Sequence, residues 1–375
     1  MQRHSIVPRK NWQEKVQEYG LVWHTIDKQP YWNEAAYYSF ELSQINQIER
    51  ASSKIYEMLL EAGEYIIKNH QFSKLLIPEW AIETIINTWN DEPPCLNYGR
   101  FDFAFDGNQL KLLEFNCETP TSLLEASIIQ WFWKEELFPQ KDQFNSIHET
   151  LLSKWRDIKP LLPNQNVHFA YFDEPSGEDV INTAYMLDIA KDAGIETKLL
   201  KIDDIGWLNG QFIDLENNPI NSLYKLYPWE WMLNEEFGKN ILKLENYTIF
   251  IEPIWKMIWN NKAILPILSD LFPDSPYILK SAFSPLNCSN YVKKPILARE
   301  GANIEIYKNN MRIAKSNGPY HSNCIYQELA DIPEFDGNYP IIGAWIVDGQ
   351  PCGMGIREDG MITSNSARFV PHIIV

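Results

Sequence analysis

Two short segments on either side of residue 107 carry the pattern that most restricts the fold. Phenylalanine alternates with other residues in Arg100-Phe101-Asp102-Phe103-Ala104-Phe105, and the same period of two returns in Leu113-Glu114-Phe115-Asn116. A period of two is that of a β-strand with one apolar and one polar face. Asp106-Gly107-Asn108 between them is a turn signal. We therefore predict a β-hairpin whose phenylalanines face one side and whose polar side chains face the other.

The polar face of this hairpin predicts a metal site. A three-residue loop centred on Asn108 sets Asp102 opposite Glu114 and Arg100 opposite Asn116. Because two directly opposed carboxylates destabilise a sheet, they require a neutralising group. Oxygen ligands from Asp, Glu and Asn suit Mg²⁺, and the adjacent arginine indicates an anion beside the metal. The alternative is that Arg100 simply pairs with a carboxylate on a solvated strand face.

Composition limits the partners. The length of 375 residues favours two or three packed subdomains. A formal charge of −17 and a pI near 4.9 argue against a nucleic-acid partner and fit a cationic substrate such as a polyamine. The five cysteines are scattered without a CxxC pair, which indicates neither disulfides nor zinc. The N-terminus lacks an apolar signal region and no apolar stretch reaches ~20 residues, so we expect a cytoplasmic protein without a membrane partner.

The order of predicted elements indicates an α/β protein. Residues 43–67 read as a helix, and a second helix over 123–136 follows Thr119-Pro120-Thr121-Ser122. The alternation of a strand at 167–172, a helix at 184–193 and a strand at 196–201 is typical of a parallel βαβ unit. Further strands are expected at 223–227 and 248–251, and helices at 229–239 and 261–271. Beyond residue 291 the pattern turns to strands, which predict one antiparallel sheet.

Several segments of the last third suit a bound nucleotide. Lys294 lies on a strand just ahead of the loop Ala298-Arg299-Glu300-Gly301-Ala302-Asn303, an arrangement that resembles ATP-grasp enzymes, whereas the GxxxxGK[ST] phosphate loop is absent. Lys262 offers a second lysine, although an isolated lysine is usually a solvated surface group. The strand 324–329 is suited to an adenine hinge or is an ordinary strand end. Arg357 follows two glycines, where it could reach phosphate oxygens.

Together these segments resemble the glutathionylspermidine synthase family, specifically its synthetase half, over almost the whole chain. The resemblance is carried by Tyr31-Trp32, Ala35-Ala36-Tyr37-Tyr38, Arg100-Phe101-Asp102, Leu112-Leu113-Glu114-Phe115-Asn116, Tyr227-Pro228-Trp229-Glu230, Glu252-Pro253-Ile254-Trp255-Lys256, Asn261-Lys262-Ala263-Ile264-Leu265-Pro266, Lys294-Pro295, Arg299-Glu300-Gly301-Ala302-Asn303 and Gly355-Ile356-Arg357-Glu358.

The resemblance implies a permuted ATP-grasp fold with a pre-ATP-grasp βαβ domain. It divides the chain into helices and the metal hairpin over 1–160, the pre-ATP-grasp-like domain over 161–235, and the nucleotide-binding region over 236–375. The implied cofactors are ATP and two Mg²⁺ ions. By the family pattern the metal ligands are Asp102, Glu114 and Asn116, the residues that stabilise the transferred phosphoryl group are Arg100 and Arg357, and the nucleotide contacts come from Lys262, Lys294, Arg299, Gly301, Gln327 and Glu328.

The substrates implied by the family are a small-molecule acid, such as glutathione or a peptide, and an amine, such as a polyamine. Bifunctional members carry an N-terminal cysteine amidase domain, for which this chain has no length, so we expect no amide hydrolysis. Where those members have serines for the glutathione carboxylate, this chain has Thr119, Thr121 and Ser122. The acidic pair of the amine site is matched by Glu178-Asp179, although acidic pairs at helix starts are also ordinary partners of the helix dipole.

The leading interpretation is an ATP-dependent ligase that activates a carboxylate as an acyl phosphate and transfers the acyl group to an amine. The alternatives are a non-catalytic nucleotide-binding or regulatory protein, and a plain ATPase or small-molecule kinase with the same metal residues. We favour the ligase because the metal residues, both lysines and both arginines are all present. The release of ADP separates the three, since a ligase responds to acid and amine together, a kinase needs one acceptor, and a binding protein shows no turnover.

Overall fold

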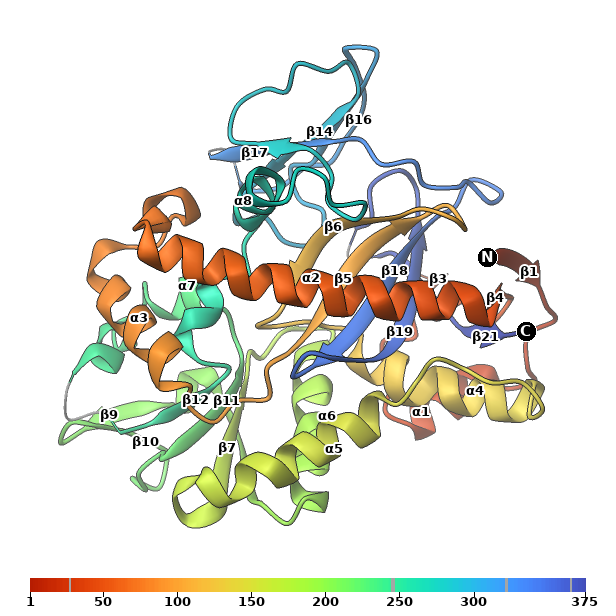
Figure 1. Ribbon diagram of the computed structural model, residues 1–375. Coiled ribbons are helices and arrows are strands. Elements are labelled where there is room, and N and C mark those ends of the chain that lie inside the picture. The colour runs from red at the N-terminus through yellow and green to blue at the C-terminus, as the bar shows by residue number, and fades with distance from the viewer. Residues whose placement is uncertain (27, 244–246, 321–322, 365) are drawn as a thin grey trace.

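A five-stranded antiparallel sheet forms the centre of the computed structural model, which describes residues 1–26, 28–243, 247–320, 323–364 and 366–375 (Figure 1). Its strand order is β20-β19-β18-β5-β6. The hairpin predicted from the sequence supplies two of the strands, and the C-terminal region supplies the other three. The bounds are Tyr98–Phe105 for β5, Leu110–Asn116 for β6, Tyr339–Val347 for β18, Gln350–Asp359 for β19 and Arg368–Val370 for β20.

A parallel sheet of order β12-β11-β7-β8 lies beside the central sheet. Helix α6 connects β7 to β8, so the predicted βαβ unit is confirmed. Its register pairs Phe169 on β7 with Leu199 on β8 and Tyr224 on β11. The bounds are Asn166–Tyr171 for β7, Glu178–Asp192 for α6, Glu196–Lys201 for β8, Ser222–Leu226 for β11 and Ile249–Ile251 for β12.

The strands after residue 280 do not form the single antiparallel sheet that the sequence predicted. Some of them make a separate sheet of order β13-β17-β14-β15-β16, at the top of Figure 1, while β18, β19 and β20 join the hairpin instead. The strand pattern alone does not specify which distant strand each one pairs with, and this explains the error. The bounds are Ser281–Ala282 for β13, Tyr291–Pro295 for β14, Glu305–Lys308 for β15, Met311–Lys315 for β16 and Cys324–Glu328 for β17.

Helices cover both faces of the central sheet. The long helix α2 (Leu42–Lys68) crosses one face, as Figure 1 shows, and α5 (Ile147–Ile158) packs on the other. Within the residues described, no helix is both long enough and apolar enough to cross a membrane. The remaining helices are α1 (Trp12–Glu18), α3 (Ile82–Asp91), α4 (Gln130–Leu137), α7 (Trp229–Met232) and α8 (Ile264–Leu271), and the remaining strands are β1 (Gln2–Ser5), β2 (Thr25–Ile26), β3 (Gln29–Pro30), β4 (Ala36–Phe40), β9 (Gly206–Leu208), β10 (Gln211–Ile213) and β21 (His372–Ile374).

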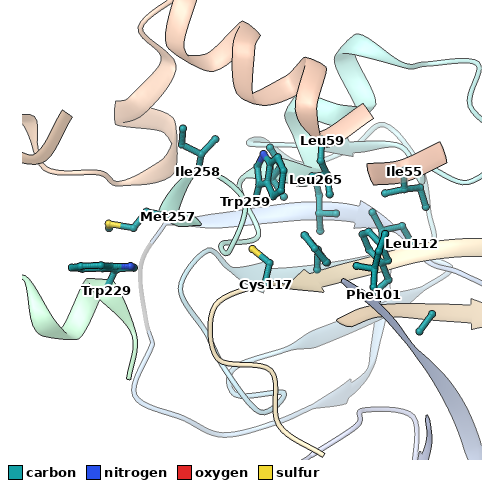
Figure 2. Close-up of a cluster of buried hydrophobic side chains, with 14 of the residues drawn as sticks. Ile55, Leu59, Phe101, Leu112, Cys117, Trp229, Met257, Ile258, Trp259 and Leu265 are labelled. Carbon is teal, nitrogen blue, oxygen red and sulfur yellow. The ribbon is translucent and has the colours of Figure 1, made fainter. Parts of the chain in front are cut away.

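The apolar face of the hairpin packs into the larger hydrophobic core. Figure 2 shows Phe101 near Ile55 and Leu112, with Trp259 and Leu265 further along the same cluster. Phe101, Phe103 and Phe105 are all fully buried there, each worth about 1.5–3 kcal/mol of transfer free energy. The prediction that the phenylalanines share one side is therefore confirmed, and the polar side chains are left on the opposite side.

Several predicted helices have different bounds in the structure, among them the helix expected at 184–193, which is α6 over Glu178–Asp192. The segment 229–239 is helical only to Met232, and the Asn234 side chain bonds the carbonyl of Glu230 at 2.7 Å, a local interaction that competes with a longer helix. Helix α8 starts at Ile264 and not at residue 261, because Asn261 accepts the N–H of Ala263 in a turn. The segment 123–136 contains a π-helix over Glu125–Ile129 ahead of α4.

Candidate active site

The hairpin has the predicted register, but it reaches that register by a different route. Asp102 lies opposite Glu114 and Arg100 opposite Asn116. The loop has four residues, 106–109, and not three, since Phe105 pairs with Leu110 and the Asp106 carboxylate accepts the N–H groups of Asn108 and Gln109. A β-bulge at Leu113 then shifts the pairing by one residue. The longer loop and the bulge compensate, so the two carboxylates still meet.

Arg100 pairs with Asp102, as the alternative interpretation expected, but the two side chains are buried and not solvated. Arg100 is 5% exposed and Asp102 is 3% exposed. The Arg100 guanidinium holds Asp102 with two hydrogen bonds, from Nε to Oδ1 at 2.7 Å and from Nη2 to Oδ2 at 3.1 Å, and its Nη1 donates to the Thr121 carbonyl at 2.6 Å. Arg357 on β19 donates to Asp102 Oδ2 at 2.7 Å. Asp102 therefore lies between two arginines from different strands.

The second carboxylate of the pair faces lysines. Lys262 Nζ lies 2.9 Å from Glu114 Oε2 and also donates to the Ala298 carbonyl at 2.6 Å. Burial would raise the pKa of Glu114, but the charges of Lys262 and Lys294 hold that pKa well below its usual range, so the group is ionised. Lys294 itself donates to Gln327 Oε1 at 2.6 Å, and burial lowers its pKa to about 8 despite the nearby charge of Glu114.

Asn116 links the two carboxylates and allows a test of the predicted metal site. Its Nδ2 lies 3.4 Å from both Asp102 Oδ2 and Glu114 Oε1. A half-turn of this amide would bring Oδ1 to the same place, which would complete a set of oxygen donors of the kind that Mg²⁺ prefers. The described part of the chain has no cluster of three His, Cys, Asp or Glu residues suited to a metal. The three residues thus fit Mg²⁺ by donor type, with two carboxylates and one amide.

A cavity of about 280 Å³ gathers almost all of the predicted site residues. Its polar lining comes from the central sheet, the ends of β11 and β14, and the loops after β6 and β14. The predicted residues that line it are Arg100, Asp102, Glu114, Asn116, Thr119, Thr121, Asp179, Lys262, Lys294, Arg299, Gly301, Gln327, Glu328 and Arg357. Residues separated by more than 250 positions in the sequence therefore meet in one cavity.

Ser122 and Glu178 do not line this cavity. Ser122 is buried, and its Oγ lies 3.3 Å from the hydroxyl of Tyr31. Glu178 hydrogen bonds Thr121 at the cavity wall, and burial and the negative charges of Glu125 and Asp179 raise its pKa to about 8. Asp179 does reach the cavity, and burial together with nearby carboxylates raises its pKa to about 7. Of the acidic pair, Asp179 therefore lines the cavity, whereas Glu178 contacts Thr121 in its wall.

The predicted adenine hinge has part of its backbone already engaged. The N–H of Glu328 donates to the Lys280 carbonyl at 2.8 Å, and the N–H of Leu329 donates to Asn290 at 3.2 Å. Gln327 bonds Lys294 and, through Nε2, the Leu112 carbonyl at 3.2 Å. These two N–H groups are therefore not available to a base, contrary to the expectation for this strand, because pairing with neighbouring segments uses them first.

Residues without a predicted role lie in the cavity wall or next to it: Glu230 lines the cavity, whereas Glu118 and Lys225 do not. Arg299 bonds Glu230 at 2.6 Å and Thr119 Oγ1 at 2.9 Å, so the loop after β14 is tied to the start of α7. Glu118, two residues after Asn116, is buried and pairs with Lys225 on β11 at 2.8 Å. Glu230 follows the Pro228-Trp229 pair that ends a strand, which was a usable signal, whereas nothing in the sequence pairs Glu118 with Lys225.

The fold of this chain has a counterpart among solved structures. A glutathione synthetase-like effector from Globodera pallida has a similar fold, with a TM-score of 0.59 over 97% of this chain and 96% of that chain, at 11% sequence identity. At this identity the likeness concerns the fold alone, which is of the mixed α/β class.

The chain belongs to the glutathionylspermidine synthase preATP-grasp family, whose model matches residues 3–375. A protein of Haemophilus influenzae described as a "putative acid–amine ligase" is 39% identical over 365 residues, which cover 93% of this chain and 92% of that protein. The bifunctional glutathionylspermidine synthetase/amidase of Escherichia coli is 27% identical over 96% of this chain but only 61% of its own length. With ligases as its named relatives, the chain is an enzyme that forms carbon–nitrogen bonds.

Proposed function

We propose that this enzyme is an ATP- and Mg²⁺-dependent ligase with a permuted ATP-grasp fold, which joins a carboxylate to an amine through an acyl phosphate. The observation that carries the proposal is the cavity in which four basic side chains surround Asp102 and Glu114. Two arginines and two lysines at one end of a cavity match the charge of a triphosphate. We also propose the three-part organisation with boundaries near residues 160 and 235.

The proposed reaction consists of two transfers. A carboxylate oxygen attacks the γ-phosphorus of ATP, the bond to the β,γ-bridging oxygen breaks, and ADP leaves. The amine then attacks the acyl carbon, inorganic phosphate leaves, and the amine loses a proton. Arg100 and Arg357 are placed to stabilise the charge on the transferred phosphoryl oxygens, while Lys262 and Lys294 bind the nucleotide phosphates. Asp102, Glu114 and Asn116 would hold Mg²⁺, which when bound offsets negative charge on the phosphates.

The two substrates are proposed to enter from the side of the cavity that faces the parallel sheet. Thr119 and Thr121 offer hydroxyl groups to the acid, for which glutathione or a peptide is the family precedent. Asp179, supported by Glu178, offers negative charge to a cationic amine such as a polyamine. The excess of acidic residues in the whole chain favours the approach of such a cation.

Two neighbouring lysines on β14 provide a matched test of this proposal. Lys294 lines the cavity, whereas Lys293 does not, and its Nζ lies 3.7 Å from Oε1 of Glu305 on the neighbouring strand β15. We expect Lys294→Met to lower ATP turnover by about 10²-fold or more, because a donor to the phosphates is lost. Lys293→Met should keep the wild-type rate, and both should keep the wild-type Tm within a few degrees. Equal rates in the two variants would remove Lys294 from the site.

The metal residues and the reaction type are tested together. Asp102→Asn and Glu114→Gln should each abolish Mg²⁺-dependent ATP turnover, as measured by ADP release. In the wild type, ADP release should rise when an acid and an amine are supplied together, and mass spectrometry should find their amide. Turnover with a single acceptor, with a phosphorylated product, would establish a kinase instead. Turnover with neither would indicate an ATPase, and no turnover in any combination would favour a nucleotide-binding protein.

A further inference from the structure

Gly343 on β18 leaves the space in which the Arg100 side chain lies. It is directly opposite Asp102 on β5 and Gly355 on β19. A Cβ atom added to Gly343 would be 2.8 Å from Arg100 Cδ and 3.3 Å from both Cγ and Nε. Ordinary contact begins at 3.4 Å. The stem of Arg100 therefore passes directly over the backbone of this glycine.

This path follows from the hydrogen bonds that Arg100 makes. Arg100 and Asp102 are two residues apart on one strand, so their side chains point to the same face of the sheet. To hold both oxygens of Asp102, the arginine must fold along the sheet instead of standing away from it. In doing so it crosses the neighbouring strand at the residue paired with Asp102, which is Gly343.

Gly355 on β19 is the next residue across the sheet after Asp102 and Gly343, and the space above it is already occupied by other side chains. A Cβ at Gly355 would be 2.7 Å from the Phe369 ring and 3.4 Å from Ala126 Cβ. The arginine stem therefore has the space above Gly343 and not the space above Gly355. Gly343 is also absent from the residues with positive φ, so its backbone would accept an alanine. Space, and not backbone conformation, is what requires glycine at this position.

We propose that Gly343 is a positioning residue for phosphoryl transfer, which acts by letting Arg100 lie flat against the sheet and hold Asp102. The inference rests on the proposed function, because Arg100 matters to the rate only if it stabilises the transferred phosphoryl group. To restore ordinary contact, an alanine at this position would displace the arginine stem by about 0.6 Å, which is the difference between 2.8 Å and 3.4 Å. Displacements of about 1 Å in a reacting constellation cost up to about 10²-fold in rate.

The first measurement compares Gly343→Ala with Gly360→Ala. At Gly360 an added Cβ has no neighbour within 4 Å among the described residues outside its own chain neighbours, and φ is not positive. We expect Gly343→Ala to lower kcat by about 10- to 100-fold with little change in the KM for ATP, while Gly360→Ala matches the wild type. A wild-type kcat in Gly343→Ala would overturn the inference. An inactive wild type under all substrate combinations would instead refute the proposed function.

The second measurement does not depend on activity. The substitution Gly343→Ala is introduced into the wild-type protein and into Arg100→Ala, and the change in Tm is measured in each background. In Arg100→Ala the side-chain stem that the new Cβ would contact is absent. We expect a fall of about 1–5 °C in the wild type, typical of overpacking, and none in the truncated background. Equal falls in both would show that the alanine clashes with something other than Arg100. That result would overturn the inference even if kcat is reduced.

Discussion

The substitution Lys225→Met tests the buried ion pair that joins the segment after β6 to the parallel sheet. Both side chains of the Lys225–Glu118 pair have no exposed surface. Lys225 donates to Glu118 at 2.8 Å and to the Tyr227 carbonyl at 2.7 Å, and its ammonium lies 4.1 Å from the centre of the Trp229 ring. Methionine fills much of the same volume, so the change mainly removes the charge and the hydrogen bonds.

The expected loss follows from what remains around Glu118. The carboxylate keeps the N–H of Trp229 and Asn260 Nδ2, the latter at 2.9 Å, but has lost its buried counter-charge. Removal of one partner of a buried pair costs about 3–5 kcal/mol in the free energy of unfolding, because the other charge stays buried. The double variant Lys225→Met with Glu118→Gln should lose clearly less than the sum of the two single losses.

The loss should also depend on pH. Burial raises the pKa of Glu118 and Lys225 opposes that rise, so in Lys225→Met the pKa of the folded state increases further above its unfolded value. A raised folded-state pKa means that stability is retained below the unfolded pKa and is lost as the pH rises through the folded value. The variant should therefore be more destabilised at pH 8 than at pH 4.5, the ordinary pKa of a glutamate, where the unfolded carboxylate is only half ionised.

Urea titration followed by tryptophan fluorescence measures this loss as the free energy of global unfolding, because the 14 tryptophans report the unfolding of the whole chain. Glu57→Gln is a suitable control, because it removes an exposed partner of Lys54 on α2 and should change the free energy of unfolding by less than about 1 kcal/mol. A loss below about 1 kcal/mol in Lys225→Met, or a loss equal at both pH values, would refute this reasoning.

Two further predictions concern titrating groups. His372 is fully buried, accepts the Phe144 N–H at Nε2 and contacts Gln130 through Nδ1, and burial lowers its pKa to about 3. Its folded-state pKa lies below the unfolded value, so the free energy of unfolding decreases as the pH falls below about 6.5, by about 1.4 kcal/mol at pH 5.5. In urea titrations His372→Gln should remove this pH-dependent loss. Asp179, whose pKa burial raises to about 7, should ionise between pH 6 and 8. The KM for a cationic amine should therefore fall over that range in the wild type and stay constant in Asp179→Asn, and a parallel fall in both proteins would exclude Asp179 from the amine site.

The hairpin shows how much of the site could be predicted from the sequence. Alternation of residues 100–105 and 113–116 predicted the two faces of the hairpin, because periodicity is a local property, whereas the pairing of Asp102 with Glu114 was predicted from the assumed turn. The alternation did not give the bulge at Leu113, which depends on packing beyond the two strands. The correct register came from two errors that cancelled, a loop one residue too short and a missing bulge.

The contacts across long sequence separations were the part that the sequence could not supply. No local pattern shows that Arg100 shares its space with Gly343, or that Lys225 pairs with Glu118. Likewise, the sequence left open whether the strand at 324–329 is an adenine hinge or an ordinary strand end, and its neighbours use the N–H groups of Glu328 and Leu329. The resemblance of motifs brought the correct side chains together, while their partners emerged only from the three-dimensional arrangement.

The mixed origin of the central sheet also affects how the chain is made on the ribosome. Strand β5 emerges early, but its partner β18 is synthesised only near the end of translation. Until then β5 has a free edge with unpaired backbone groups, the kind of surface that invites aggregation. A nascent chain stalled before residue 339 would lack β18 and β19, and with β19 the strand that carries Arg357. The cavity should therefore form only when synthesis is nearly complete.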